Sequence, residues 1–316
     1  MIGVLLINEF FKLIKKKKIF VFAVLTIIAS VLQVLLTYKY DESKNIDWKS
    51  SAEAQIEYAQ ELAKDENIDK NLEDYKEVMR QKKYAEYILS NNISSMYIRT
   101  YWEAVADSLN VMVLASIFSI LICCDIFCEE YSLKTLKMVF TRPNKRSEIW
   151  LVKILTTIIL FIIFSFIIII TSCLINSFLY DSSQVNQSIL YLNDKGLVIQ
   201  KSYMLYMLQT YLCGIFEGLG YILLTALCTV LFKNASITMA ISLVMLFGSN
   251  IFISMYEQKF EWIKYILFYN SDLSQYLNNG VAFWKTTFGY SFVVSVVYYI
   301  IFFVAGSIIY SKQEIY

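Results

Sequence analysis

The sequence contains no histidine, a single proline and no glycine-rich phosphate-binding loop. Without histidine the chain cannot form a Ser-His-Asp or Cys-His nucleophile, or a zinc or haem site with histidine ligands. No GxxxxGK[ST] stretch occurs, so the chain does not bind ATP by that route. We therefore predict that it is not an enzyme and has no catalytic, cofactor-binding or metal-binding residues of its own.

Charged residues are also scarce, at 17% of the chain, whereas 57% of the residues are hydrophobic. Soluble domains carry about a quarter charged residues. The apolar residues form six runs long enough to cross a membrane: 19–37, 109–128, 154–179, 204–232, 235–256 and 287–310. These must be helices, because an open strand cannot satisfy its backbone in lipid. The sequence predicts an all-α membrane protein with six transmembrane helices.

The basic residues that flank these runs predict the orientation. Six spans place both termini on one side, where the short flanks hold 12 lysines and arginines against 5 on the other side. Cytoplasmic loops carry the excess of basic residues. We expect a multi-pass protein of the cell membrane with both termini cytoplasmic. Lys15 to Lys18, just before the first run, also suit contact with anionic membrane lipids.

The long polar segment 39–108 lies between the first two runs and carries ten basic and fifteen acidic residues. Residues 52–64 and 72–89 are rich in helix-forming Ala, Glu, Lys and Gln. They predict two helices on the extracellular side, and one possible arrangement of the two is a helical hairpin. Their apolar stripe is thin, which favours packing against a neighbour over a binding groove.

The segment between the second and third runs is the most informative. Glu129 and Glu130 precede an amphipathic stretch with lysines on one face, and Pro143 ends that stretch. We expect a short charged helix on the cytoplasmic surface, joined to two spans and suited to receive force from a cytosolic partner. The other interpretation is a solvated basic connector.

These residues resemble the permease subunits of type-2 ABC exporters. The family pattern is matched by Glu129/Glu130, Thr135-Leu136-Lys137, Thr141-Arg142-Pro143, Arg146 and Lys153. The sequence departs from the family at two points. It has Ser132-Leu133 where a glycine commonly precedes the Thr-Leu pair, and its outer loop is longer than in the smallest members of the family. Residues 8–13 resemble the family's interfacial entry helix, and 257–285 its re-entrant element.

The resemblance implies three parts: an interfacial helix and first span over 1–38, an extracellular helical loop over 39–108, and a five-span remainder over 109–316. The last part includes a coupling helix at 129–146 and the re-entrant outer segment at 257–285. The residues implied to couple to the ATPase are Glu129, Glu130, Lys134, Lys137, Arg142, Pro143 and Arg146.

The function that the resemblance implies is export of an antimicrobial peptide or another amphipathic or toxic compound. The chain would form the transmembrane pathway. A separate cytosolic ABC ATPase, present as a dimer, would bind the ATP, and a second permease copy or homologue would complete the pathway. No nucleic-acid partner is expected.

Glu217 is the one ionisable residue well inside an apolar run. A carboxylate there costs roughly 2.5 to 3.5 kcal/mol, which the apolar residues of the same run outweigh. Gly214, Gly218 and Gly220 would let another helix approach closely. Glu217 is thus a candidate pathway residue, or a protonated structural carboxyl between helices.

Two other functions fit parts of the sequence. One is a membrane-anchored sensor or scaffold whose outer loop binds a ligand, although six spans exceed what an anchor needs. The other is an intramembrane protease, because Glu129-Glu130 is similar to the paired glutamates of prenyl-protein proteases. Those enzymes need an arginine where Lys134 stands, and histidines, which this chain lacks.

Overall fold

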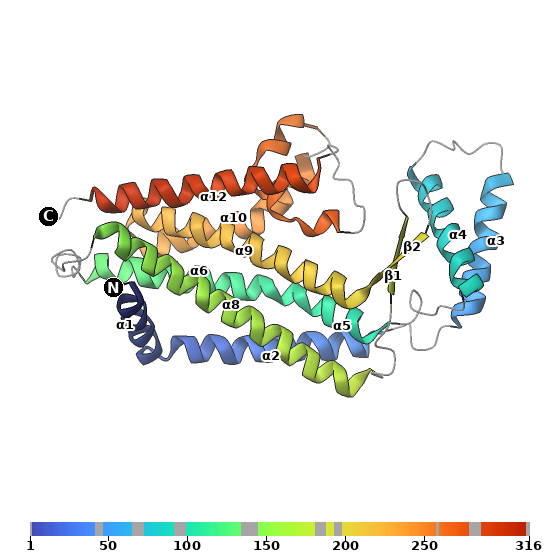
Figure 1. Ribbon diagram of the computed structural model, residues 1–316, viewed down its shortest axis with the longest axis horizontal. Helices are drawn as coiled ribbons and strands as arrows, with labels where there is room; N and C mark the ends of the chain where they lie inside the picture. The colour runs from blue at the N-terminus through green and yellow to red at the C-terminus, as the bar shows by residue number, and fades with distance from the viewer. Residues whose placement is uncertain are drawn as a thin grey trace. The chain divides into compact units, whose positions relative to one another are not determined.

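The computed structural model describes residues 2–41, 47–64, 73–91, 99–133, 145–180, 188–192, 198–256, 259–277 and 286–313. The chain forms two compact units (Figure 1). The first consists of Met1–Val31, Ser108–Thr171 and Thr210–Tyr316, and the second of Leu32–Asp107 and Ser172–Gln209.

Six helical segments are long and apolar enough to cross a membrane, as the sequence predicts. Five contain the predicted run whole, and the last is shifted by one residue. They are α2 (Lys18–Lys39), the continuous segment of α5 (Tyr101–Asp107), a 3-10 turn η2 (Ser108–Val111) and α6 (Met112–Ser132), then α8 (Arg146–Leu179), α9 (Tyr203–Phe232), α10 (Ala235–Tyr256) and α12 (Phe288–Ser311).

The first unit begins with the amphipathic helix α1 (Ile2–Lys15), which buries Leu13. Figure 1 shows α1 running across the direction of α2. The change of direction occurs at Lys17, whose φ of 57° lies in the left-handed region. We call residues 16–18 the elbow. Residues 8–13, where the sequence predicts an entry helix, are therefore helical, and the interfacial position of this helix stays a prediction.

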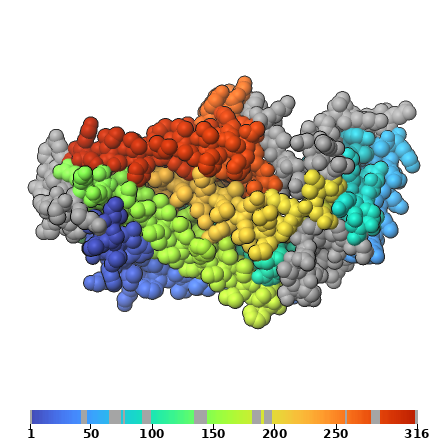
Figure 2. All heavy atoms as spheres, in the orientation of Figure 1, coloured from blue at the N-terminus to red at the C-terminus, as the bar shows by residue number. Residues whose placement is uncertain are grey.

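The transmembrane helices of the first unit pack around α6. Ile120 and Cys124 of α6 form a buried cluster with Tyr221 of α9 and Leu246 of α10. The outer faces of α2 and α12 are instead mostly exposed, and both helices lie at the surface in Figure 2. Apolar helices with exposed apolar faces are what a lipid environment requires.

Glycines let the helices of this bundle approach closely. A Cβ added at Gly220 of α9 would lie 2.7 Å from the ring of Tyr299 in α12, and one at Gly218 would overlap the ring of Phe161 in α8. The Tyr299 hydroxyl donates a hydrogen bond to the carbonyl of Phe216, at 2.9 Å. The close approach predicted for these glycines is confirmed.

The predicted re-entrant segment 257–285 is described from 259 to 277, where it is broken into short turns: η4 (Glu261–Tyr265), α11 (Leu267–Ser271) and η5 (Ser274–Tyr276). The buried side chain of Asn270 holds the first two of these turns and α12 together through hydrogen bonds. Its amide donates to the carbonyls of Lys264 and Ile266 at 2.7 and 2.8 Å, and its side-chain oxygen accepts from Ser291 of α12 at 2.7 Å. The location of this segment relative to a membrane stays a prediction.

The second unit holds the helical part of the long polar segment. Helices α3 (Trp48–Lys64) and α4 (Glu73–Asn91) pack against each other, close to the predicted bounds 52–64 and 72–89. In the same unit the Tyr180 hydroxyl donates to Asp41 at 3.2 Å. Burial and the charge of Asp41 raise the pKa of Tyr180 to about 12.

The second unit also contains strands, which the all-α prediction did not include. β1 (Ser188–Leu192) pairs antiparallel with β2 (Val198–Ser202), with Leu190 opposite Gln200. Leu190 joins Tyr84 and Ile88 of α4 in a small buried core. The sequence signal was present: β-forming residues flank Asn193-Asp194-Lys195-Gly196, a combination typical of a hairpin turn.

We predict that Gly220→Ala destabilises the protein, because the added methyl must displace the Tyr299 ring; overpacking costs ~1–3 kcal/mol. Gly248→Ala is the matched control within a span, since its Cβ would meet only Val244, at 3.9 Å. Thermal unfolding in detergent should show a lower midpoint for Gly220→Ala than for Gly248→Ala. Equal midpoints would show that the helices do not approach this closely.

Candidate functional site

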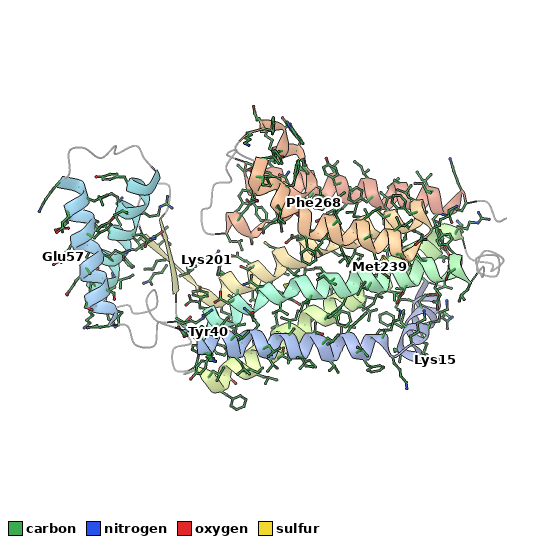
Figure 3. All side chains as sticks on the ribbon, turned by 180° about the vertical axis from the view of Figure 1, so that it is seen from behind. Lys15, Tyr40, Glu57, Lys201, Met239 and Phe268 are labelled. Carbon is green, nitrogen blue, oxygen red and sulfur yellow. The ribbon has the colours of Figure 1, made fainter. Side chains whose placement is uncertain are left out.

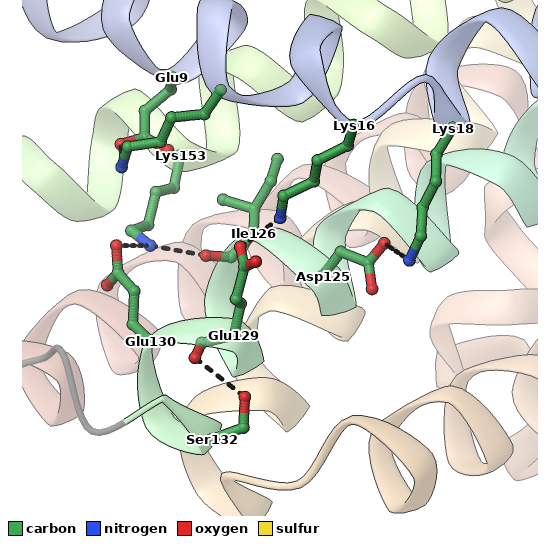
Figure 4. Close-up of polar contacts among 10 residues, drawn as sticks. Glu9, Lys16, Lys18, Asp125, Ile126, Glu129, Glu130, Ser132 and Lys153 are labelled. Carbon is green, nitrogen blue, oxygen red and sulfur yellow. Dashed lines mark hydrogen bonds and ion pairs between the residues drawn. The ribbon is translucent and has the colours of Figure 1, made fainter.

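Three carboxylates lie in the last turns of α6: Asp125, Glu129 and Glu130. The carbonyl end of a helix carries a partial negative charge, so carboxylates there are unfavourable unless cations neutralise them. Each of the three pairs with a lysine from another helix or from the elbow (Figure 4). We call these six residues the α6 charge cluster.

Two of the pairs attach the elbow to α6. Lys18 lies 2.7 Å from Asp125, and Lys16 pairs with Glu129. Both pairs are partly exposed to solvent, so each contributes at most about 1 kcal/mol. Because both lysines belong to one three-residue turn, the two pairs together fix where α1 and α2 meet α6.

The third pair is buried and joins α8 to α6. The Lys153 ammonium lies 2.8 Å from Glu130 and donates to the carbonyl of Ile126 at 2.7 Å. The two side chains are only 1% and 10% exposed. The ammonium also lies 5.2 Å from the centre of the Phe127 ring. A buried pair costs desolvation, and loss of one partner leaves an uncompensated charge in the interior.

Arg146, the first residue of α8, attaches the end of α12. Its guanidinium donates to the carbonyls of Ser311 and Gln313, at 2.9 and 3.0 Å. A cation suits the carbonyl end of a helix. Gln313 accepts from the Tyr131 hydroxyl of α6 at 2.7 Å and donates to the carbonyl of Val230 in α9 at 3.3 Å. The ends of α6, α8, α9 and α12 are therefore tied together.

Aromatic rings form the apolar side of this junction. Phe127 of α6, Trp150 of α8 and Tyr310 of α12 pack with ring centres 5.0 to 6.2 Å apart. All three are buried. Trp150 lies directly over Gly306 of α12, where a Cβ would overlap the indole ring. This packing closes the apolar side of the junction.

The structure brings three of the predicted coupling residues to this junction: Glu129, Glu130 and Arg146. Helix α6 continues through Ser132, so the first residues of the predicted coupling helix 129–146 extend a span. The remaining predicted residues, Lys134, Lys137, Arg142 and Pro143, lie outside the described residues. The coupling helix itself stays a prediction.

Glu217 lies elsewhere in the first unit. It is half-buried in α9, and the Tyr221 hydroxyl one turn later is 3.5 Å from its carboxylate. Val230, the α9 residue whose carbonyl bonds Gln313 at the junction, is thirteen residues further along the chain, which is about 20 Å along a helix. Glu217 is therefore not part of the α6 charge cluster, and both interpretations given above still stand.

Sequence reasoning gave no role in a site to Lys16, Lys18, Asp125 or Gln313. The two lysines were interpreted as topology signals and as contacts for anionic membrane lipids, not as partners of α6 carboxylates. A usable signal existed, because three carboxylates in the last two turns of one helix need cations nearby. Which lysines supply the charge depends on tertiary contacts, since Lys16 and Glu129 are 113 residues apart.

Comparison with known proteins gives one family and two relatives. A family model described as "Protein of unknown function (DUF2705)" matches residues 75–316. "Uncharacterized protein YhcI" of Bacillus subtilis (strain 168) is 29% identical over 273 residues, covering 86% of this chain and 85% of that protein. "Uncharacterized membrane protein YdbK" of the same organism is 26% identical over 212 residues, covering 66% of this chain and 80% of that protein. Together with the six apolar helices, this indicates a multi-pass membrane protein.

We predict that Lys153→Met destabilises the protein by about 3–5 kcal/mol, because it leaves the Glu130 charge buried and unpaired. The double variant Lys153→Met with Glu130→Leu should recover most of that loss. Lys12→Met, which removes the exposed pair with Glu9, is the control and should cost under about 1 kcal/mol.

Unfolding by heat or by sodium dodecyl sulfate in mixed micelles would measure the stability of each of these variants. A double variant as unstable as Lys153→Met alone would contradict the explanation that the unpaired Glu130 charge causes the loss.

Proposed function

The chain belongs to the DUF2705 family, and we propose that it acts as the transmembrane permease subunit of an ATP-driven ABC exporter. In this proposal it forms the substrate pathway with a second permease copy or a homologue. A separate cytosolic ATPase binds and hydrolyses the ATP. The exported compound is an antimicrobial peptide or another amphipathic or toxic molecule.

The observation that carries this proposal is the way α6 and α8 are anchored on both sides of residues 134–144. Glu130 of α6 pairs with Lys153 of α8, and Arg146 of α8 bonds the end of α12. A force applied to the segment between α6 and α8 would therefore reach the elbow and at least three transmembrane helices at once. A permease driven by a cytosolic motor needs this kind of junction.

The positions of the ends of the first unit support the proposed topology. Helix α1 and the last turn of α12 lie at the same end of this unit in Figure 1. The α6 charge cluster joins the elbow to that end, and the excess of basic residues predicts that it is cytoplasmic. An ATPase in the cytosol would then meet α6 and α8 directly.

We predict that a cysteine at position 312 is cytoplasmic and one at position 57 is external. Lys312 and Glu57 are both exposed, five of the native cysteines are buried, and Cys173→Ala removes the half-buried one. A membrane-impermeant maleimide should label Glu57→Cys in intact cells and Lys312→Cys only after permeabilisation. The reverse pattern would overturn the orientation and, with it, cytosolic docking at this end.

We also predict that the chain, purified gently from its native membrane, brings a stoichiometric ABC ATPase with it. The triple charge reversal Lys134→Glu, Lys137→Glu and Arg142→Glu should abolish that association, because these residues lie in the proposed docking segment. The matched control is Lys195→Glu, Lys201→Glu and Lys259→Glu, which reverses three lysines in the loops on the opposite side.

Mass spectrometry and nucleotide hydrolysis of the eluate would measure the association. A properly inserted chain that elutes without an ATPase would contradict the permease proposal and direct attention to the outer loop as a receptor. An ATPase lost equally from both triple variants would contradict docking on 134–142.

A further inference from the structure

A hollow lies beside the α6 charge cluster, between the elbow, α6 and the turn from α9 to α10. Its polar part encloses about 740 Å³ and is lined by Lys16, Lys18, Asp125, Glu129 and Lys233, among others. A second, more apolar part of about 310 Å³ shares Lys16, Lys18 and Asp125 with it. We call the two together the elbow hollow.

The elbow hollow has two lysines more than its carboxylates neutralise. Lys16 and Lys18 pair with Glu129 and Asp125. Lys17 and Lys233 line the apolar and polar parts respectively, and both are exposed. Within the described part of the chain neither has a carboxylate partner. The hollow therefore carries a net positive charge, which suits an anionic occupant.

The same two lysines have an unusual backbone. Lys17 has φ of 57° and Lys233 has φ of 54°, and no other non-glycine residue in the described ranges has a positive φ. The left-handed conformation is unfavourable for residues with a Cβ, and glycine or asparagine would adopt it at lower cost. Both lysines follow a helix C-terminus, and their N–H groups bond the carbonyls of Ile14 and Thr229 in the last turns of α1 and α9. A cation is favourable at this end of a helix, so the two turns hold positive charge at the hollow.

The apolar part of the hollow indicates that the occupant also has a hydrocarbon portion. Its lining includes Val21 and Phe22 of α2, Leu121 of α6 and Met239 of α10. Met239 is labelled in Figure 3. Here α2 also exposes large apolar side chains, with Phe20 58% and Leu25 44% exposed. A chain lying on Val21 would thus continue onto a surface that lipid covers.

We propose that the elbow hollow binds an anionic phospholipid of the surrounding membrane. The excess positive charge that Lys17 and Lys233 give the hollow attracts the phosphate, and one acyl chain lies along Val21, Phe22, Leu121 and Met239. Bound there, the lipid would bridge the elbow and the turn from α9 to α10. This inference does not depend on an ATPase partner.

The test uses the full chain in detergent, with phosphatidylglycerol and phosphatidylcholine as probes and native mass spectrometry as the readout. The variant Lys17→Gly with Lys233→Gly removes both charges and keeps turns that glycine adopts readily. Its affinity for phosphatidylglycerol should fall at least tenfold, while its thermal midpoint stays equal or rises. Lys49→Gln with Lys259→Gln, two exposed lysines that do not line the hollow, should leave the affinity unchanged.

Two further arms identify the occupant. Filling the apolar part with Met239→Trp should weaken phosphatidylglycerol binding, whereas soluble glycerol phosphate should bind at least tenfold more weakly than the lipid. The proposal is overturned if the glycine variant keeps wild-type affinity or if phosphatidylcholine binds equally well. It is also overturned if glycerol phosphate binds as tightly as the lipid, because the site would then recognise free phosphate.

Discussion

The neutralisation of the three carboxylates at the end of α6 is the constraint on which this end of the protein depends. Glu129 and Glu130 sit in the last turn of α6, where the helix already carries a partial negative charge, and Asp125 lies one turn earlier, beside the apolar bundle. Lysines from the elbow and from α8 compensate them. These contacts join α8 and the elbow between α1 and α2 to α6.

The buried and exposed pairs have different roles. Lys153 and Glu130 are almost fully buried, so the position of α8 on α6 is set by an interaction that is costly to break. The elbow pairs are partly exposed and individually weak. α6 and α8 thus form a firm pair, whereas the elbow is held by contacts that a partner or a lipid could shift. That combination suits a permease in which one end receives motion.

Much of the fold follows from the sequence, because long apolar runs leave few alternatives to helices. All six runs became helices, and the two helices of the long polar segment formed close to their predicted bounds. The strands β1 and β2 were missed because each is only five residues long and both lie within a segment that was predicted as a loop. At the site, Glu129, Glu130 and Arg146 were named from a motif. Lys153, the partner of Glu130, belongs to the same motif. Lys16 and Gln313 were not named, since they reach Glu129 and Arg146 only through long-range packing.

The most direct test of the account is a structure, by electron cryo-microscopy, of the complex isolated from its native membrane. We expect two permease subunits and a dimeric ATPase whose contacts lie at the ends of α6 and α8, next to the α6 charge cluster. A chain that is isolated without an ATPase, or an ATPase bound away from these helix ends, would contradict it.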